Sequence, residues 1–181
     1  MMIEVLQELA KVFHFTRKSC YLIFNIHASQ LCDTQFIHCV HQLRQSIGSR
    51  VDIVLEIVER SPRFFDSTLV ATMDSLRDVG IRFAIDDFNP VSSPLTCFDY
   101  SGFSFIKLDR SIVQVYEDRL VNQHLIKSLV SMSQDLGLHL IVEGVESEVQ
   151  RRLLNNCGVV DMQGYLFHLP MPLGQFLNCY Q

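Results

Sequence analysis

The chain has 181 residues, of which 48% are hydrophobic, so it is long enough to bury one sizeable core. Its formal net charge is −5, which argues against DNA, RNA or an anionic membrane as a partner, because those surfaces require clustered Lys and Arg. The apolar runs are too short to cross a bilayer, and the acidic N-terminal segment does not resemble a signal peptide.

Runs rich in β-branched and aromatic residues alternate along the chain with segments of helical spacing, after an N-terminal stretch that is itself predicted to be helical. The predicted strands cover 21–26, 51–57, 81–86, 103–108 and 138–143, with a weaker one at 159–165. Nearly continuous apolar strands are typical of a parallel sheet covered by helices. The pattern therefore predicts an α/β protein with a barrel or an open sheet.

Four further helices are predicted between these strands, each ending at a glycine. Their starts are predicted at Asp33, at Asp66 or Ser67, before Leu125, and at Ser147, and their ends at Gly48, Gly80, Gly137 and Gly158. Their apolar faces are predicted to be Phe36, Val40, Leu43 and Ile47; Leu69, Met73 and Leu76; Leu125, Leu129, Met132 and Leu136; and Val149, Leu153 and Leu154. A complete eight-stranded barrel takes about 250 residues, so roughly six strands predict an incomplete TIM-like (β/α) barrel.

Each predicted strand ends in a side chain that can bind a metal or move a proton. These residues are Asn25, Glu56, Asp86 with Asp87, Lys107, Glu143 and Gln163. Because the carboxyl ends of parallel strands meet at one edge, we expect the side chains to gather in an acidic site. A single acidic residue at a strand end is more often a helix cap or a solvated loop residue, but a full series of them favours a functional site.

Clustered carboxylates repel one another unless cations neutralise them. Oxygen ligands favour Mg²⁺ or Mn²⁺ over zinc, and paired metals of this kind commonly promote attack on phosphate esters. Lys107 is expected to orient the attacking water or to stabilise developing charge.

The six cysteines form no Cys-x-x-Cys pair and lie among apolar residues, as reduced core thiols do. A disulfide framework is the less favoured alternative, because a chain of this size has a core and needs no covalent cross-links. The pattern predicts a reducing, cytoplasmic location.

Several motifs in order resemble the EAL domain, the bacterial cyclic di-GMP phosphodiesterase. They are FNIHASQL at 24–31, LEIVER at 55–60, FAIDDF at 83–88, FIKLDR at 105–110, IVEGVE at 141–146 and QGYLFHLP at 163–170. The resemblance runs from about residue 3 to 177 and treats residues 1–181 as a single EAL-like domain. It implies a modified TIM barrel with two divalent metals that hydrolyses cyclic di-GMP to pGpG.

The resemblance also implies roles for individual residues. Asn25, Glu56 and Asp86 resemble ligands of a first metal, and Asp87 resembles a ligand of a second. Lys107 resembles the lysine that positions the water, and Glu143 another carboxylate of the site. Glu146 resembles the glutamate that steadies the loop after the double aspartate, and Gln163 a polar residue near the water. Glu59 matches a family position, but strand alternation directs it away from Glu56, so we expect a salt bridge or a cap there instead.

The sequence departs from the family in two places. No Glu-Ala-Leu triplet occurs, so we expect the first barrel strands to be absent, together with one metal ligand and an arginine for substrate phosphate. The glycine-rich loop that follows the double aspartate in the family is replaced by Asn89-Pro90-Val91-Ser92-Ser93-Pro94-Leu95. Prolines fix φ where glycines would give mobility, so the loop is expected to have lost its control function.

These departures predict a degenerate EAL-family domain that acts by protein contact or nucleotide binding, with little or no hydrolysis and weak Mg²⁺ or Mn²⁺ binding. The alternative is a metal-dependent phosphodiesterase, because most of the implied catalytic set is present. An open barrel edge also predicts a regulatory protein partner or a homodimer. A fragment of a longer protein is a further alternative.

Overall fold

The computed structural model describes residues 20–47, 51–58, 67–90, 93 and 102–179. The chain divides into two compact units, residues 1–83 with 171–181, and residues 84–170. The main sheet has six strands in the order β1-β2-β3-β4-β7-β8, and β3 (Ile81–Phe88) contributes residues to both units. The predicted number of strands is therefore confirmed, and β1–β2, β3–β4, β4–β7 and β7–β8 pair in parallel, as expected.

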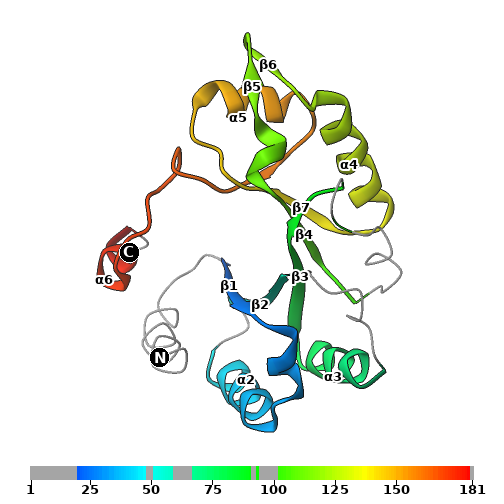
Figure 1. The fold of residues 1–181 in the computed structure, drawn as a ribbon. Helices are drawn as coiled ribbons and strands as arrows, with labels where there is room; N and C mark the ends of the chain where they lie inside the picture. The colour runs from blue at the N-terminus through cyan, green and yellow to red at the C-terminus, as the bar shows by residue number, and fades with distance from the viewer. Residues whose placement is uncertain (1–19, 48–50, 59–66, 91–92, 94–101, 180–181) are drawn as a thin grey trace. The chain divides into compact units, whose positions relative to one another are not determined.

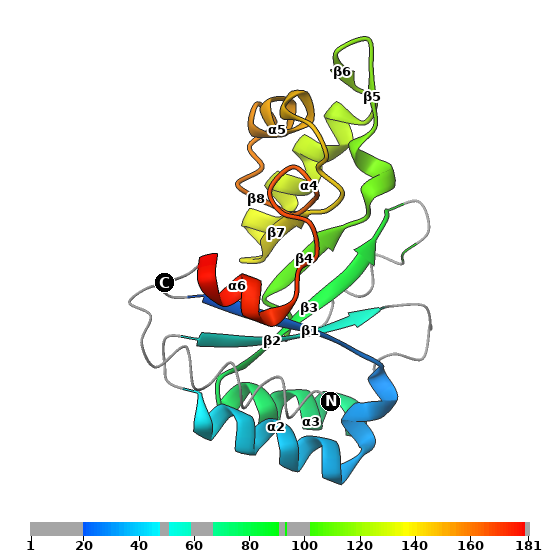
Figure 2. The ribbon, with the colours of Figure 1, turned by 90° about the vertical axis from the view of Figure 1, so that its left-hand side faces the viewer.

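The first unit is built on the parallel pair of β1 (Cys20–Ile26) and β2 (Val51–Val58). A short 3-10 helix, η1 (Ala28–Cys32), leads from β1 into α2 (Thr34–Ser46), and α3 (Ser67–Asp78) follows β2 in the chain. Figures 1 and 2 show α2 and α3 on the same side of these strands. The unit also contains α6 (Leu173–Cys179), which the sequence pattern did not predict.

Both central helices of the first unit form where the sequence predicted them. Asp33 caps α2 by accepting a hydrogen bond from the backbone N–H of Gln35, at 2.8 Å. The predicted apolar faces are confirmed, because Phe36, Val40, Leu43, Ile47, Leu69, Met73 and Leu76 are all buried. Gly80, at φ 86°, ends the α3 segment as expected, whereas Gly48, Glu59, Asp66 and the expected N-terminal helix lie outside the described residues.

The second unit continues with β4 (Phe105–Leu108), β7 (His139–Val142) and β8 (Asp161–Met162). These strands are shorter than the runs that predicted them. All four residues of β4 are buried, which fits a parallel strand covered on both faces. A second, two-stranded sheet of β5 (Val115–Tyr116) and β6 (Arg119–Leu120) was not predicted.

Helices α4 (Gln123–Asp135) and α5 (Glu148–Asn155) lie in the second unit, where α4 packs on β7 and α5 contacts β6 (Figure 1). Ser147 caps α5 in a reciprocal arrangement with Gln150, as the sequence indicated. The apolar face predicted for α4 is correct only in part: Leu129 is buried as expected, but Leu136 is 47% exposed, and the buried stripe also includes Ile126, Val130 and Ser133.

The pattern of the described cysteines agrees with the expected reduced state. Cys32, Cys39 and Cys157 are free thiols. Burial raises the pKa of the Cys157 thiol, while the nearby charge of Lys127 acts in the opposite direction. Separately, no helix in the described ranges combines the length and the hydropathy that a membrane span requires.

Candidate metal centre

The adjacent aspartates lie on an irregular part of β3. Ile85 pairs with Ile106 and Phe88 pairs with Leu108, so Asp86 and Asp87 together lie opposite the single residue Lys107. Asp87 has φ 50°, in the left-handed region, which Asp tolerates better than most residues do. Such a β-bulge changes the directions in which successive side chains point, so the two carboxylates do not simply alternate between opposite faces.

Lys107 is the buried cation of this site. The residue is 4% exposed, and its neighbours in β4 are buried as well. Its Nζ lies 2.5 Å from Glu143 Oε1 and 3.5 Å from Asp86 Oδ1. A lysine is rarely buried without a paired charge, and here two carboxylates stabilise its ionised form.

One carboxylate oxygen of Asp86 is buried without a hydrogen-bond donor in the described residues. Its side chain is 10% exposed, and its buried Oδ1 accepts no hydrogen bond from the described part of the chain. The ion pair with Lys107 does not satisfy this oxygen, because 3.5 Å is too long for a well-formed hydrogen bond to an ammonium. A buried carboxylate oxygen without a donor is costly, and a cation beside it would remove that cost.

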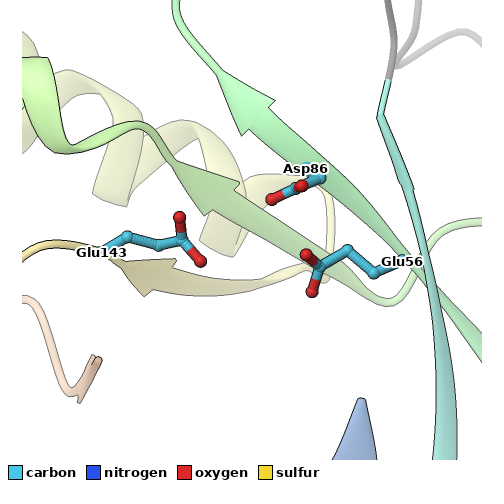
Figure 3. Close-up of side chains that lie close together, drawn as sticks. All are labelled: Glu56, Asp86 and Glu143. Carbon is cyan, nitrogen blue, oxygen red and sulfur yellow. The ribbon is translucent and has the colours of Figure 1, made fainter. Parts of the chain in front are cut away.

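Glu143 follows β7 and brings a second carboxylate to the same place. Its backbone N–H donates to the carbonyl of Leu108 at 3.2 Å, which fixes the residue beside the end of β4. Oxygens of Asp86 and Glu143 lie within 4.8 Å of one another, and Figure 3 shows the two carboxylates turned toward each other. One lysine between two carboxylates leaves an excess of negative charge, which suits a hard divalent cation.

The first unit carries two more of the expected ligands at the end of its parallel pair. Asn25 of β1 lies in register with Glu56 of β2, so both side chains share one face of the pair. Glu56 is 2% exposed, whereas Asn25 is exposed. Figure 3 also draws the Glu56 side chain, which ends in a carboxylate.

The remaining expected residues lie in the second unit, Asp87 within β3 and the other two after β7 and β8. Asp87 is exposed at the bulge. Glu146 is exposed, and its backbone N–H donates to Gln150 Oε1 at 2.8 Å, so this residue is fixed at the start of α5. Gln163 is exposed, and its backbone N–H donates to the carbonyl of Val142 at 2.8 Å.

The EAL domain family model matches residues 1–170, which is nearly the whole chain. This chain belongs to the EAL domain family. The expectation from the sequence motifs is therefore confirmed.

Curated relatives of this EAL domain carry phosphodiesterase names. Cyclic di-GMP phosphodiesterase RocR of Pseudomonas aeruginosa is 35% identical over 158 residues, which is 87% of this chain and 40% of that protein. Cyclic di-GMP phosphodiesterase PdeL of Escherichia coli is 31% identical over 140 residues, which is 77% of this chain and 39% of that protein. The chain thus spans about two fifths of the length of these relatives.

Solved structures show the same fold. The EAL domain of Mycobacterium smegmatis DcpA aligns with a TM-score of 0.85 at 23% identity, covering 99% of this chain and 81% of that one. The EAL enzyme Bd1971, in its form with cAMP and cyclic di-GMP bound, aligns with a TM-score of 0.83 at 24% identity, covering 99% of this chain and 49% of that one. The predicted TIM-like barrel class of this EAL domain is therefore confirmed.

Two structural features of the EAL domain were not anticipated from its sequence. Asn89, directly after the bulge, donates from Nδ2 to Ser111 Oγ at 3.2 Å. Gly164 packs so closely on Val145 that an added Cβ would overlap the backbone nitrogen and oxygen of that residue. No local sequence pattern indicates either contact, because each joins residues that are distant in sequence.

The contact at Gly164 predicts a loss of stability on substitution. We expect Gly164→Ala to lower the free energy of unfolding by about 2 kcal/mol, because the new methyl group meets backbone that must shift. Gly174→Ala is the matched control, since a Cβ there meets nothing within 4 Å and replaces glycine within α6. Urea unfolding followed by circular dichroism measures both variants, and equal stability of the two would show that the overlap is relieved without cost.

Proposed function

We propose that this chain binds cyclic di-GMP through divalent cations held by its carboxylates, and that its 181 residues hydrolyse the nucleotide weakly or not at all. In this proposal residues 1–181 act as a single EAL-like domain in cyclic di-GMP signalling, by nucleotide binding or protein contact. The observation that carries the proposal is the buried Asp86 Oδ1, which accepts no hydrogen bond from the described residues and lies in a site with two carboxylates and one lysine.

The residues present fit Mg²⁺ or Mn²⁺. Glu56, Asp86 and Glu143 each offer a carboxylate oxygen, and Asn25 adds an amide oxygen in register with Glu56. The resemblance to EAL domains supports assigning Asn25, Glu56 and Asp86 to a first metal and Asp87 to a second, with Glu143 as another carboxylate of the site. Such metals would supply charge to polarise a phosphate ester and to activate a water.

The chain's own residues then have separate tasks. Lys107, held by Glu143 and Asp86, would orient the water and neutralise charge that develops on the phosphate. In this proposal Gln163 lies near that water. Glu146, whose backbone is held at the start of α5, steadies the loop that follows the bulge. The carboxylates would bind the cations.

Two features support weak hydrolysis. The segment after Asp87 contains Pro90 and Pro94 where related domains have a glycine-rich loop, and Pro restricts both its own φ and the preceding residue. The 181 residues also contain no Glu-Ala-Leu triplet, so by themselves they supply one carboxylate ligand fewer. Charge count and ligand number set the affinity of hard cations, so we expect weak metal binding.

The alternative is a metal-dependent phosphodiesterase that converts cyclic di-GMP to pGpG. The buried Lys107 between two carboxylates favours it, because this is the arrangement expected for positioning a nucleophilic water. The relatives RocR and PdeL carry that activity in their names.

Protein contact is the remaining part of the proposal. A regulatory protein or a second copy of the chain would pair with an open barrel edge, since exposed strand edges offer unpaired backbone groups. Exposed apolar side chains near β8 support such a contact: Val160, Tyr165, Phe167 and Leu169. The free thiols Cys32 and Cys39 are consistent with the cytoplasmic location that we propose.

Incubation of the chain with cyclic di-GMP and Mg²⁺ or Mn²⁺, followed by chromatography for pGpG, tests the proposal against its alternative. We expect retained nucleotide with at most traces of pGpG, because the site lacks part of its ligand set. The control is the same incubation with EDTA. Efficient turnover that disappears in Asp86→Asn would contradict weak hydrolysis and establish the phosphodiesterase.

A further inference from the structure

We propose that Asn89 is a positioning residue that holds the two aspartates of the bulge in their ligand directions by tying β3 to the chain that follows β4. The inference rests on the proposed metal site, because it concerns how Asp86 and Asp87 are presented to a cation. It assigns a role to the side chain of Asn89, which is not one of the expected metal ligands.

The bulge needs such a support. Asp86 and Asp87 lie opposite Lys107 alone, so one residue of β3 has no ladder partner on β4. Asp87 is in the left-handed region at φ 50°. A non-glycine residue in this region costs free energy and persists only where its surroundings hold it.

The chain after the bulge is held on both sides of Asn89. The carbonyl of Phe88 accepts a hydrogen bond from the backbone N–H of Asp109 at 3.2 Å. The backbone N–H of Asn89 donates to Ser93 Oγ at 3.2 Å, and the N–H of Ser93 donates back to the carbonyl of Asn89 at 2.7 Å. This reciprocal pair closes a turn that begins two residues after Asp87.

The side chain of Asn89 connects this turn to a different element. Its Nδ2 donates to Ser111 Oγ at 3.2 Å, and Ser111 lies in η3 (Arg110–Val113), the 3-10 helix that follows the Lys107 strand. Asp109 caps that helix by accepting from the N–H of Ser111 at 2.9 Å. A glycine at 89 would keep the backbone hydrogen bonds but lose the link to η3.

Pro90 further restricts the backbone of Asn89. A residue before proline is restricted to extended backbone, so Asn89 has fewer conformations to lose when it forms these contacts. The carboxylates of Asp86 and Asp87 therefore lie between two fixed points, the β3 ladder and the Asn89–Ser111 hydrogen bond.

The test is Mn²⁺ titration by calorimetry of the full chain and a set of variants. We expect Asn89→Ala and Ser111→Ala each to bind Mn²⁺ about 3- to 10-fold more weakly, the range that one lost hydrogen bond predicts. The double variant should lose no more than either single variant, because both remove the same link. Ser111→Thr retains the hydroxyl and should restore the affinity. The matched control is Ser128→Ala, whose hydroxyl donates to the His124 carbonyl on α4, away from the bulge.

A second measurement, on metal-free protein, separates the positioning role of Asn89 from the proposed metal binding. Asn89→Ala and Ser111→Ala should both shift the ¹H–¹⁵N resonances of the Asp86 and Asp87 amides, and Ser128→Ala should not. Unchanged Mn²⁺ affinity in Asn89→Ala and Ser111→Ala, with weakened binding in Asp86→Asn, would overturn the positioning role and leave the metal site intact. Failure of the unsubstituted chain to bind Mn²⁺ would overturn the proposed function instead. In that case unmoved Asp86 and Asp87 resonances would also overturn the positioning role, and shifted resonances would support it.

Discussion

Replacing Asp86 with asparagine is expected to weaken Mn²⁺ binding by about 100-fold or more. Asparagine keeps the size of the side chain but removes the charge of a ligand whose Oδ1 is buried without a hydrogen-bond donor in the described chain. Loss of a group that only supports a metal ligand already costs about 10- to 100-fold in affinity, so loss of a charged ligand should cost at least that much. Isothermal titration with Mn²⁺ measures the effect directly.

The control for this substitution is Asp135→Asn. Asp135 is an exposed carboxylate at the end of α4, so the variant has the same change in net charge without a change in the site. We expect it to bind Mn²⁺ as the unsubstituted chain does. Equal affinities for Asp86→Asn and Asp135→Asn would mean that Asp86 is no ligand and that bulk charge alone attracts the cation.

Replacing Lys107 with methionine is expected to destabilise the metal-free protein by about 3 kcal/mol, the lower end of the cost of breaking a buried ion pair. Methionine fills a similar volume, but it leaves the carboxylates of Asp86 and Glu143 within 4.8 Å of each other without their cation. The lower end applies because the Glu143 side chain is 21% exposed and is partly solvated. Urea unfolding in EDTA, followed by circular dichroism, measures this loss.

Added Mn²⁺ should return much of the stability that Lys107→Met removes, because a divalent cation supplies positive charge at the same carboxylates. Lys127→Met serves as the control, since Lys127 is exposed on α4 and its loss should change little in either condition. A loss in Lys107→Met that is the same with Mn²⁺ as with EDTA would indicate that the lysine supports packing alone and that no cation binds beside it.

The arrangement of the strands was predictable because its signals are local and repeated. Strand β4 shows this most clearly, because all four of its residues are buried. Helix starts were predictable for the same reason, since Asp33 and Ser147 act on backbone groups only two or three residues away. The candidate ligands were predicted from the polar side chains at the ends of the apolar runs.

The buried face of α4 was not predictable from hydrophobicity. Two stripes of this helix are apolar, and the buried one includes Ser133, whose hydroxyl donates to the Val130 carbonyl at 2.8 Å. A polar residue satisfied within its own helix can be buried at low cost, so the stripe that contained it appeared less apolar than the predicted stripe, in which Leu129 is buried but Leu136 is exposed.

The β-bulge at Asp86 and Asp87, and the Asn89–Ser111 hydrogen bond that supports it, could not be predicted from the sequence either. Adjacent aspartates in a regular strand would point to opposite faces, and only the pairing of Ile85 and Phe88 with β4 shows that an additional residue is present. The link from Asn89 to Ser111 joins residues 22 positions apart, so it depends on the tertiary fold. The hairpin of β5 and β6 is short enough that no alternating pattern develops, and its turn uses Glu117 and Asp118 at positive φ in place of glycine.

Equilibrium dialysis of cyclic di-GMP against the full chain tests the central claim most directly, with Ca²⁺ in one chamber series and EDTA in the other. Calcium is chosen because a solved EAL structure, Klebsiella pneumoniae BlrP1, is a complex with calcium and the dinucleotide. The account predicts saturable binding in Ca²⁺ that disappears in EDTA and in Asp86→Asn. Binding of equal strength in EDTA, or no binding in either condition, would contradict it.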